Sequence, residues 1–184
     1  MIYILNHKTH FMKKVFLAAT FVVASFMGAY AQPAEGFQFG GGVRASLPIG
    51  NFSDSYSFGI GAELQGEYGI SDMISAVATT GYSSFFGKNI DLGGGVSYKP
   101  KAMGYIPILV GARVYPSTNF FVGAQIGYGL FTTSGSSNGG FNYQPQVGYN
   151  AEAFQVALNY NGLSKNGGTT SHLGLTAIYK FGGN

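Results

Sequence analysis

The chain has 184 residues, of which only 9% are charged and 16% are aromatic, and it contains 30 glycines and no cysteine. This length suits one domain, and the lack of cysteine excludes a disulfide framework and thiolate chemistry. Few charges combined with many glycines and aromatic residues are unusual for a soluble globule. They are typical of a wall that faces lipid on one side.

Residues 1–31 have the pattern of a secretory leader, with a start at Met12. Two lysines follow this methionine, then an apolar run over 15–27, then an Ala-Tyr-Ala cleavage motif that ends at Ala31. We therefore predict a signal peptide that is cleaved after Ala31 and a barrel domain over residues 32–184. An uncleaved signal anchor is the alternative, because the apolar run is close to the shortest membrane helix.

The formal net charge of +3 comes from this leader. Three of the ten lysines and arginines lie in it, which leaves seven basic residues against the seven acidic residues of the remaining chain. A basic protein that binds nucleic acid is therefore not indicated. The sequence also contains no spacing typical of metal ligands, and we expect no cofactor.

The first four elements are segments in which apolar and polar residues alternate, a period that predicts β-strands. They cover residues 36–47, 57–68, 73–86 and 102–115. The third segment has the weakest alternation. Pro107 in the fourth predicts a bulge near the rim, because proline removes a hydrogen-bond donor from the ladder.

Four further segments with the same period complete the chain. They cover residues 120–131, 141–150, 154–161 and 171–181. The last one ends in Tyr179 and Phe181, and such an apolar edge promotes aggregation when it is left open. Closure of the last strand onto the first removes the edge.

The connections alternate in length along the chain. Long loops are expected at 48–56, 87–101, 132–140 and 162–170, and short turns at 69–72, 116–119 and 151–152. Outer-membrane barrels have an even number of strands, short periplasmic turns and longer external loops, whereas a β-sandwich has no reason for this alternation. The sequence therefore predicts an all-β fold, an eight-stranded antiparallel up-and-down transmembrane β-barrel that displays four external loops.

The alternation alone does not decide which face is outside, because a lipocalin-like barrel has an apolar interior. Aromatic residues gather at the predicted strand ends, as in the girdles at membrane interfaces, and favour an apolar exterior. These residues are Phe37, Tyr68, Tyr82, Phe120, Tyr149, Tyr160, Tyr179 and Phe181.

The opposite face predicts a polar network inside the barrel. Its members are Arg44, Glu63, Gln65, Glu67, Arg113 and Lys180. Arg44 and Glu63 should be neighbours across the first hairpin, and buried charges need partners. An eight-stranded lumen is just wide enough for side chains to fill it, so we interpret the network as an internal plug.

We predict a structural or surface-interaction role through the four external loops and no enzymatic activity. The second candidate function is transport through a narrow porin or a conduit for small hydrophobic molecules. The third is a lipid-modifying enzyme, which needs a serine and a histidine on one face, whereas His172 and Ser171 point to opposite faces of a strand. Lys88, Lys99 and Lys101 are either contacts for lipopolysaccharide phosphates or a solvated loop.

Three stretches resemble the small outer-membrane β-barrel family common in Bacteroidota, whose architecture is similar to the transmembrane domains of OmpA and OmpX. They are Ala29–Gln32, Tyr105–Leu109 and Tyr179–Phe181. The resemblance implies a Gram-negative outer-membrane location among lipid and lipopolysaccharide. It also implies that the barrel-assembly machinery recognises the final strand, a role that would fall on Tyr179 and Phe181. It leaves the partner of the external loops open.

Overall fold

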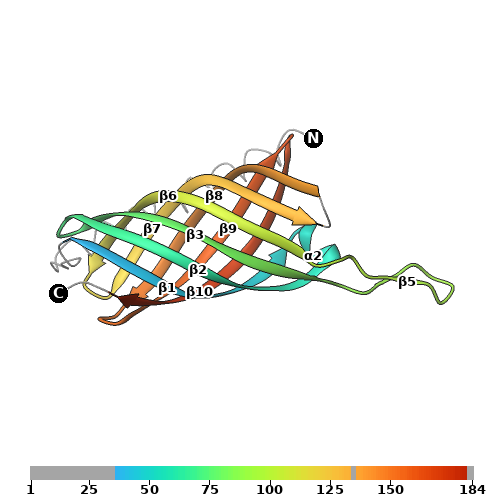
Figure 1. Cartoon of the computed structure of the whole chain (residues 1–184), viewed down its shortest axis with the longest axis horizontal. Helices are drawn as coiled ribbons and strands as arrows, with labels where there is room; N and C mark the ends of the chain where they lie inside the picture. Colours follow the sequence, from blue (N-terminus) through green and yellow to red (C-terminus); the bar gives the residue numbers. More distant parts are fainter. Residues whose placement is uncertain (1–35, 134–135, 182–184) are drawn as a thin grey trace, which may run out of the picture.

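The computed structural model describes residues 36–133 and 136–181, which form a closed barrel of eight antiparallel strands in the order β1-β10-β9-β8-β7-β6-β3-β2 (Figure 1). The predicted fold class is confirmed. The strands are β1 (Phe37–Ile49), β2 (Tyr56–Ser71), β3 (Ile74–Gly87), β6 (Met103–Ser117), β7 (Phe120–Thr133), β8 (Ser136–Asn150), β9 (Phe154–Lys165) and β10 (Gly168–Phe181). The predicted leader and its cleavage site lie outside the described residues.

Closure is made by the first and last strands. The register of β1 with β10 extends from Phe39 opposite Phe181 to Ile49 opposite Ser171. Every barrel strand therefore has two hydrogen-bonded neighbours, which removes the open edge that an isolated sheet would present.

The two ends of the barrel differ. At one end, here called the turn end, short connections at 72–73, 118–119 and 151–153 join the strands. The opposite end, here called the loop end, carries the short helix α2 (Phe52–Ser55) and the segment 88–102. This segment contains a small hairpin of β4 (Ile90–Asp91) and β5 (Ser97–Tyr98) that projects beyond the barrel (Figure 1).

Two of the four predicted long loops are wrong. β7 continues to Thr133 and β8 begins at Ser136, so most of 132–140 is strand, and β9 and β10 are joined by Asn166 and Gly167 alone. Both of these residues have positive φ, 49° and 81°, as in the tight type I′ turn. Serine, glycine and asparagine end the apolar alternation here, but they do not prevent backbone pairing.

The bulge predicted at Pro107 is also wrong. The pairs Thr80–Ile108 and Ser83–Tyr105 have the same register of β3 with β6. No residue pairs are formed between them, but the register does not shift. The proline removes one backbone donor without inserting a residue. The register shifts of the barrel lie near strand ends, for example between Val114 and Ser117.

The exterior of the barrel is apolar. Large exposed hydrophobic side chains come from all eight barrel strands, among them Val43, Ile60, Ile108, Ile126 and Leu175. A lipocalin-like barrel with an apolar interior is therefore not what the chain forms. An apolar surface of this extent requires a hydrocarbon surrounding, because soluble proteins expose only limited apolar patches.

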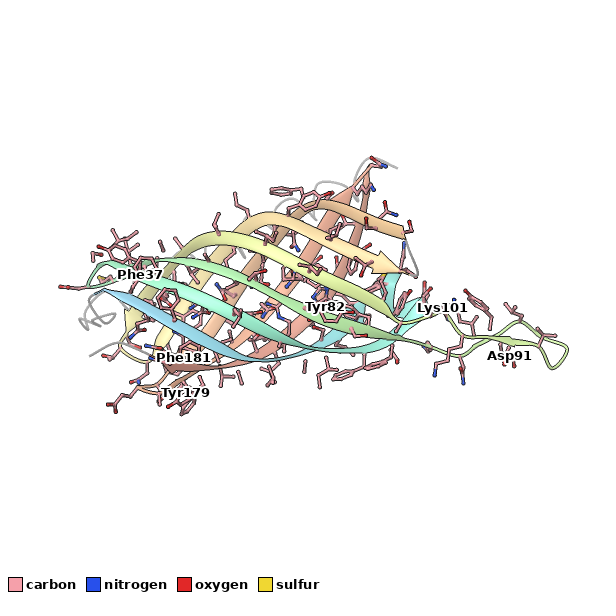
Figure 2. All side chains as sticks on the ribbon, in the orientation of Figure 1. Phe37, Tyr82, Asp91, Lys101, Tyr179 and Phe181 are labelled. Atoms are coloured by element: carbon pink, nitrogen blue, oxygen red, sulfur yellow. The ribbon has the colours of Figure 1, made fainter. Side chains whose placement is uncertain are left out.

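Aromatic side chains mark both ends of this apolar wall (Figure 2). At the turn end, the rings of Phe37 and Tyr68 lie 5.3 Å apart, as do those of Phe120 and Tyr149. Towards the loop end, the exposed rings of Tyr128 and Phe141 stand at directly paired positions of β7 and β8. Such girdles are typical of the two interfaces of a membrane-spanning barrel.

Candidate functional site: the barrel lumen

The lumen is filled by polar side chains from every barrel strand. Those with the least exposure are Arg44, Ser46, Ser75, Ser83, Arg113, Gln125, Asn142, Gln144, Gln155, Asn161, His172 and Thr176. They come from the inward-facing phase of each strand, so the period of two that makes the exterior apolar also makes the interior polar.

The first centre of the lumen is an ion pair between Arg44 and Glu63. These residues lie on adjacent strands, with Arg44 opposite Gly61 and Glu63 opposite Gly42, so their side chains meet diagonally. Arg44 Nη2 also donates to Gln144 Oε1 at 3.1 Å, across the lumen on β8. Gln144 in turn donates to Gln125 Oε1 at 3.1 Å, which links four strands through one guanidinium.

The second centre is the carboxylate of Glu67. It accepts hydrogen bonds from Arg113 Nη1 at 2.5 Å, from Ser75 Oγ at 2.5 Å, from Gln155 Nε2 at 3.2 Å and from the hydroxyl of Tyr115. Each of these donors holds the buried carboxylate of Glu67, and the carboxylate in turn fixes the position of each donor side chain.

Arg113 extends this second centre across the lumen. Its Nη2 donates to Gln65 Oε1 at 2.7 Å and to Gln146 Oε1 at 3.2 Å. The guanidinium carbon also lies 4.4 Å from the ring centroid of Phe121. The structure thus brings Gln65, Glu67 and Arg113 into one cluster.

Lys180 is connected to the second centre indirectly, because Gln155 Nε2 donates both to Glu67 Oε2 at 3.2 Å and to Asn150 Oδ1 at 3.0 Å, and Asn150 Oδ1 also accepts from Lys180. Lys180 is half-buried at the turn end, and its Nζ donates to Asn150 Oδ1 at 3.0 Å. Among the described residues it makes no hydrogen bond or ion pair with Glu63 or Glu67.

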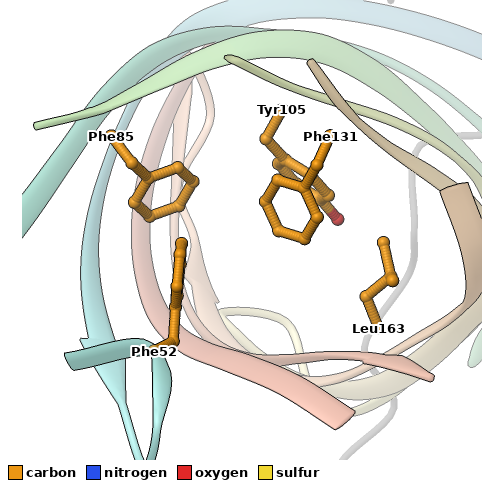
Figure 3. Packing of buried hydrophobic residues seen from close by; sticks show 5 residues of the cluster. All are labelled: Phe52, Phe85, Tyr105, Phe131 and Leu163. Atoms are coloured by element: carbon orange, nitrogen blue, oxygen red, sulfur yellow. The ribbon is translucent and has the colours of Figure 1, made fainter. Parts of the chain in front are cut away.

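Aromatic residues close the lumen towards the loop end. A buried cluster of Phe52, Phe85, Tyr105, Phe131 and Leu163 fills the interior there (Figure 3). Phe52 belongs to α2, which folds into the mouth so that its ring centroid lies 4.9 Å from that of Phe85. The sequence pattern did not identify Phe52, because it lies in a loop where alternation gives no direction.

A smaller apolar cluster lies towards the turn end. It consists of Tyr115, Phe121 and Ala157. The rings of Tyr115 and Phe121 are 5.6 Å apart. The two polar centres therefore lie between these two apolar clusters, and hydrogen bonds continue from Glu67 through Gln155 and Asn150 to Lys180 at the turn end.

His172 is a lumen residue. It is buried between Phe85 and Tyr105, with ring centroids 5.0 and 5.3 Å away. Ser171 instead forms a 2.8 Å hydrogen bond with Tyr160. Within residues 36–133 and 136–181, no His, Asp and Glu cluster could hold a metal ion.

Tyr179 and Phe181 lie on the outer face of β10 at the turn end, where they are 63% and 50% exposed (Figure 2). They do not contribute to the lumen.

No helix of the described chain is long and apolar enough to cross a membrane.

No protein-family profile matches the chain, and no curated protein matches it. Solved structures do share the fold. Ail, the attachment invasion locus protein of Yersinia pestis, was determined in a phospholipid nanodisc and superposes with a TM-score of 0.58 at 14% identity, covering 80% of this chain and 100% of Ail. The N-terminal β-barrel domain of OprF from Pseudomonas aeruginosa gives a TM-score of 0.50 at 11% identity, covering 81% of this chain and 100% of that domain. The chain therefore has the fold of the small eight-stranded outer-membrane β-barrels.

Proposed function

We propose that this chain is an integral protein of the Gram-negative outer membrane, with a plugged lumen and a structural or surface-interaction role. Its apolar wall with two aromatic girdles supports insertion in a bilayer. The short connections of the turn end then face the periplasm, and α2 and the β4–β5 hairpin lie outside the cell. The sequence resemblance supports the finer assignment to the Bacteroidota-type family.

The observation that carries the proposal is the filled lumen. Two buried ion pairs, Arg44–Glu63 and Arg113–Glu67, are linked to amide side chains on the opposite wall and are covered by aromatic clusters. Removing one member of such a pair leaves an uncompensated buried charge, which makes opening of the plug costly. A closed plug supports a role at the exposed end of the barrel and argues against a transport pathway.

Single-channel recording in planar bilayers tests this function. The wild-type protein should give no steady conductance, whereas a wide porin added to the same bilayer provides the positive control. Large, regular conductance steps from the protein itself would contradict the plug and favour the narrow-porin alternative.

The external end has a surface that could interact with polyanions. Lys88, Lys99, Lys101 and Lys165 are all exposed at the loop end. Ammonium groups bind phosphate and sulfate as point charges. One crystal structure of Ail contains the heparin analogue sucrose octasulfate, which supports a polyanion as ligand class for this fold.

We infer lipopolysaccharide phosphates as the ligand of these lysines. The triple variant Lys88→Gln, Lys99→Gln and Lys101→Gln should retain less lipopolysaccharide after purification than the wild type. Lys180→Gln, at the opposite end, is the control and should retain the same amount. If the triple variant retained as much lipopolysaccharide as the wild type, these lysines would only be part of a solvated loop.

Secretion and assembly complete the proposal. We infer cleavage after Ala31, so that N-terminal sequencing of the mature protein should begin at Gln32. An N-terminus that still carries the leader would favour the signal anchor. Exposure of Tyr179 and Phe181 on the final strand supports their recognition by the barrel-assembly machinery.

A further inference from the structure

The lipid-facing wall is not uniform, because it contains a hollow of about 660 Å³ over β2, β3 and β6. Its floor runs along β3 through Ala76, Ala78 and Thr80 and includes Gly66 of β2. These positions carry small side chains or none on the outward-facing phase, where most of the belt carries large ones. The hollow is therefore a consequence of sequence and not of barrel shape.

Two ridges border the floor. Thr80 lies between Leu64 of β2 and Ile108 of β6, which are its direct partners on the two sides. One pair further along, Ala78 lies between Gly66 and Val110. The hollow is thus a groove that follows β3, bordered on one side by Ile108 and Val110 of β6 and on the other by Leu64 and Tyr68 of β2 and by Phe39 of β1, whose ring lies over Gly66.

The width of the groove limits what can occupy it. At the level of Thr80, the ridge residues Leu64 and Ile108 stand on the two strands beside β3, so their backbones are two strand spacings apart, about 10 Å. Side chains of the ridges take up part of this width. An α-helix with its side chains is about 10–12 Å across and does not enter, whereas a single extended hydrocarbon chain does.

The position of the groove indicates which lipid provides that chain. The lining continues towards the turn end to the aromatic residues Phe37, Tyr68 and Phe181. The turn end faces the periplasm in the proposed orientation, so these rings lie at the level of the inner-leaflet headgroups. The groove is continuous with the apolar belt, so hydrocarbon of the same leaflet reaches it directly.

We propose that this groove binds one acyl chain of an inner-leaflet phospholipid. The proposal rests on the proposed insertion in the outer membrane. It assigns to the wall a specific lipid site in addition to general solvation by lipid.

Carbene labelling tests the site. The full protein is placed in bilayers of phosphatidylethanolamine that carries a photoactivatable diazirine on its acyl chain, and labelled peptides are mapped by mass spectrometry. Residues 76–80 should be labelled several-fold more than residues 122–126 of β7. Ala78→Phe, which fills the groove, should remove the excess.

Ala124→Phe is the matched control. Ala124 also faces outward, but its direct partners are Ala112 and Pro145, so no ridges stand beside it. This variant should leave the labelling of residues 76–80 unchanged. Ala78→Leu, a smaller change, serves as a second groove variant, and each variant is first shown to be folded by its gel mobility.

Three results would overturn the site. They are equal labelling of the two walls in the wild type, an excess that persists in both Ala78 variants, and crosslinks between two copies of the chain at β3. Failure of the wild-type protein to insert into bilayers would instead contradict the proposed function, so the two failures are distinguishable.

Discussion

Arg44 and Arg113 are the residues whose burial has the largest energetic consequence, because each guanidinium is almost inaccessible and is paired with one carboxylate. Bringing such charges out of water is costly, and only a complete set of partners compensates the cost. The lumen is therefore most sensitive at these two side chains.

Replacement of Arg44 by alanine leaves Glu63 charged and buried without its partner. We expect the free energy of unfolding to fall by about 3–5 kcal/mol, the range found when one member of a buried pair is removed. Urea unfolding of the protein in lipid vesicles measures this change.

Two variants are controls for losses of stability that are unrelated to the Arg44–Glu63 pair. Lys165→Ala removes an exposed lysine and should change stability by less than about 1 kcal/mol. The double variant Arg44→Ala and Glu63→Ala should be less destabilised than the sum of the single changes, because the orphan charge is gone. An Arg44→Ala protein as stable as the wild type would mean that the pair contributes nothing.

His172→Ala tests the enzymatic alternative at the same scale. The ring lies between Phe85 and Tyr105 and away from Ser171, so its removal should leave the acyl pattern of lipid A unchanged in mass spectra. A variant with an altered pattern, restored by the wild-type protein, would require a catalytic role for this histidine.

At the scale of the elements, a period of two determines which face of each strand is outside, and the sequence shows it directly. The same period does not determine where each strand ends. Alternation between apolar and polar residues ends before the strands do, because backbone pairing does not require apolar side chains, so β7, β8, β9 and β10 are longer than predicted. Asn166-Gly167 does carry a sequence signal for a two-residue hairpin.

Some contacts of the candidate site follow from the sequence alone, and others do not. Proximity of Arg44 to Glu63 follows from the register of a single hairpin. The contact of Arg113 with Glu67 joins β6 to β2, which are not neighbours, so it depends on the barrel diameter and cannot be derived from spacing. The inward position of Phe52 depends on how α2 folds into the mouth.

The final strand allows a prediction about assembly. The double variant Tyr179→Ala and Phe181→Ala should insert more slowly into vesicles that contain the barrel-assembly machinery, while insertion into vesicles without it changes little. Leu173→Ala with Leu175→Ala, on the same face of β10, is the control and should not show this difference. Equal slowing of both variants would remove the recognition role.

At the scale of the whole molecule, the features agree with one another. Closure between β1 and β10 removes the sheet edge, the apolar belt is matched to lipid, and the polar lumen is sealed by its own side chains. None of these arrangements is stable alone, since an apolar exterior in water promotes aggregation and an unpaired charged lumen resists folding.

The most direct test of this account is the mobility of the membrane-fraction protein in SDS gels, with and without boiling. A closed barrel resists SDS when it is cold, so the unboiled protein should migrate differently from the boiled protein. Identical mobility of the two samples, together with recovery of the protein in the soluble periplasmic fraction, would contradict the membrane-spanning barrel.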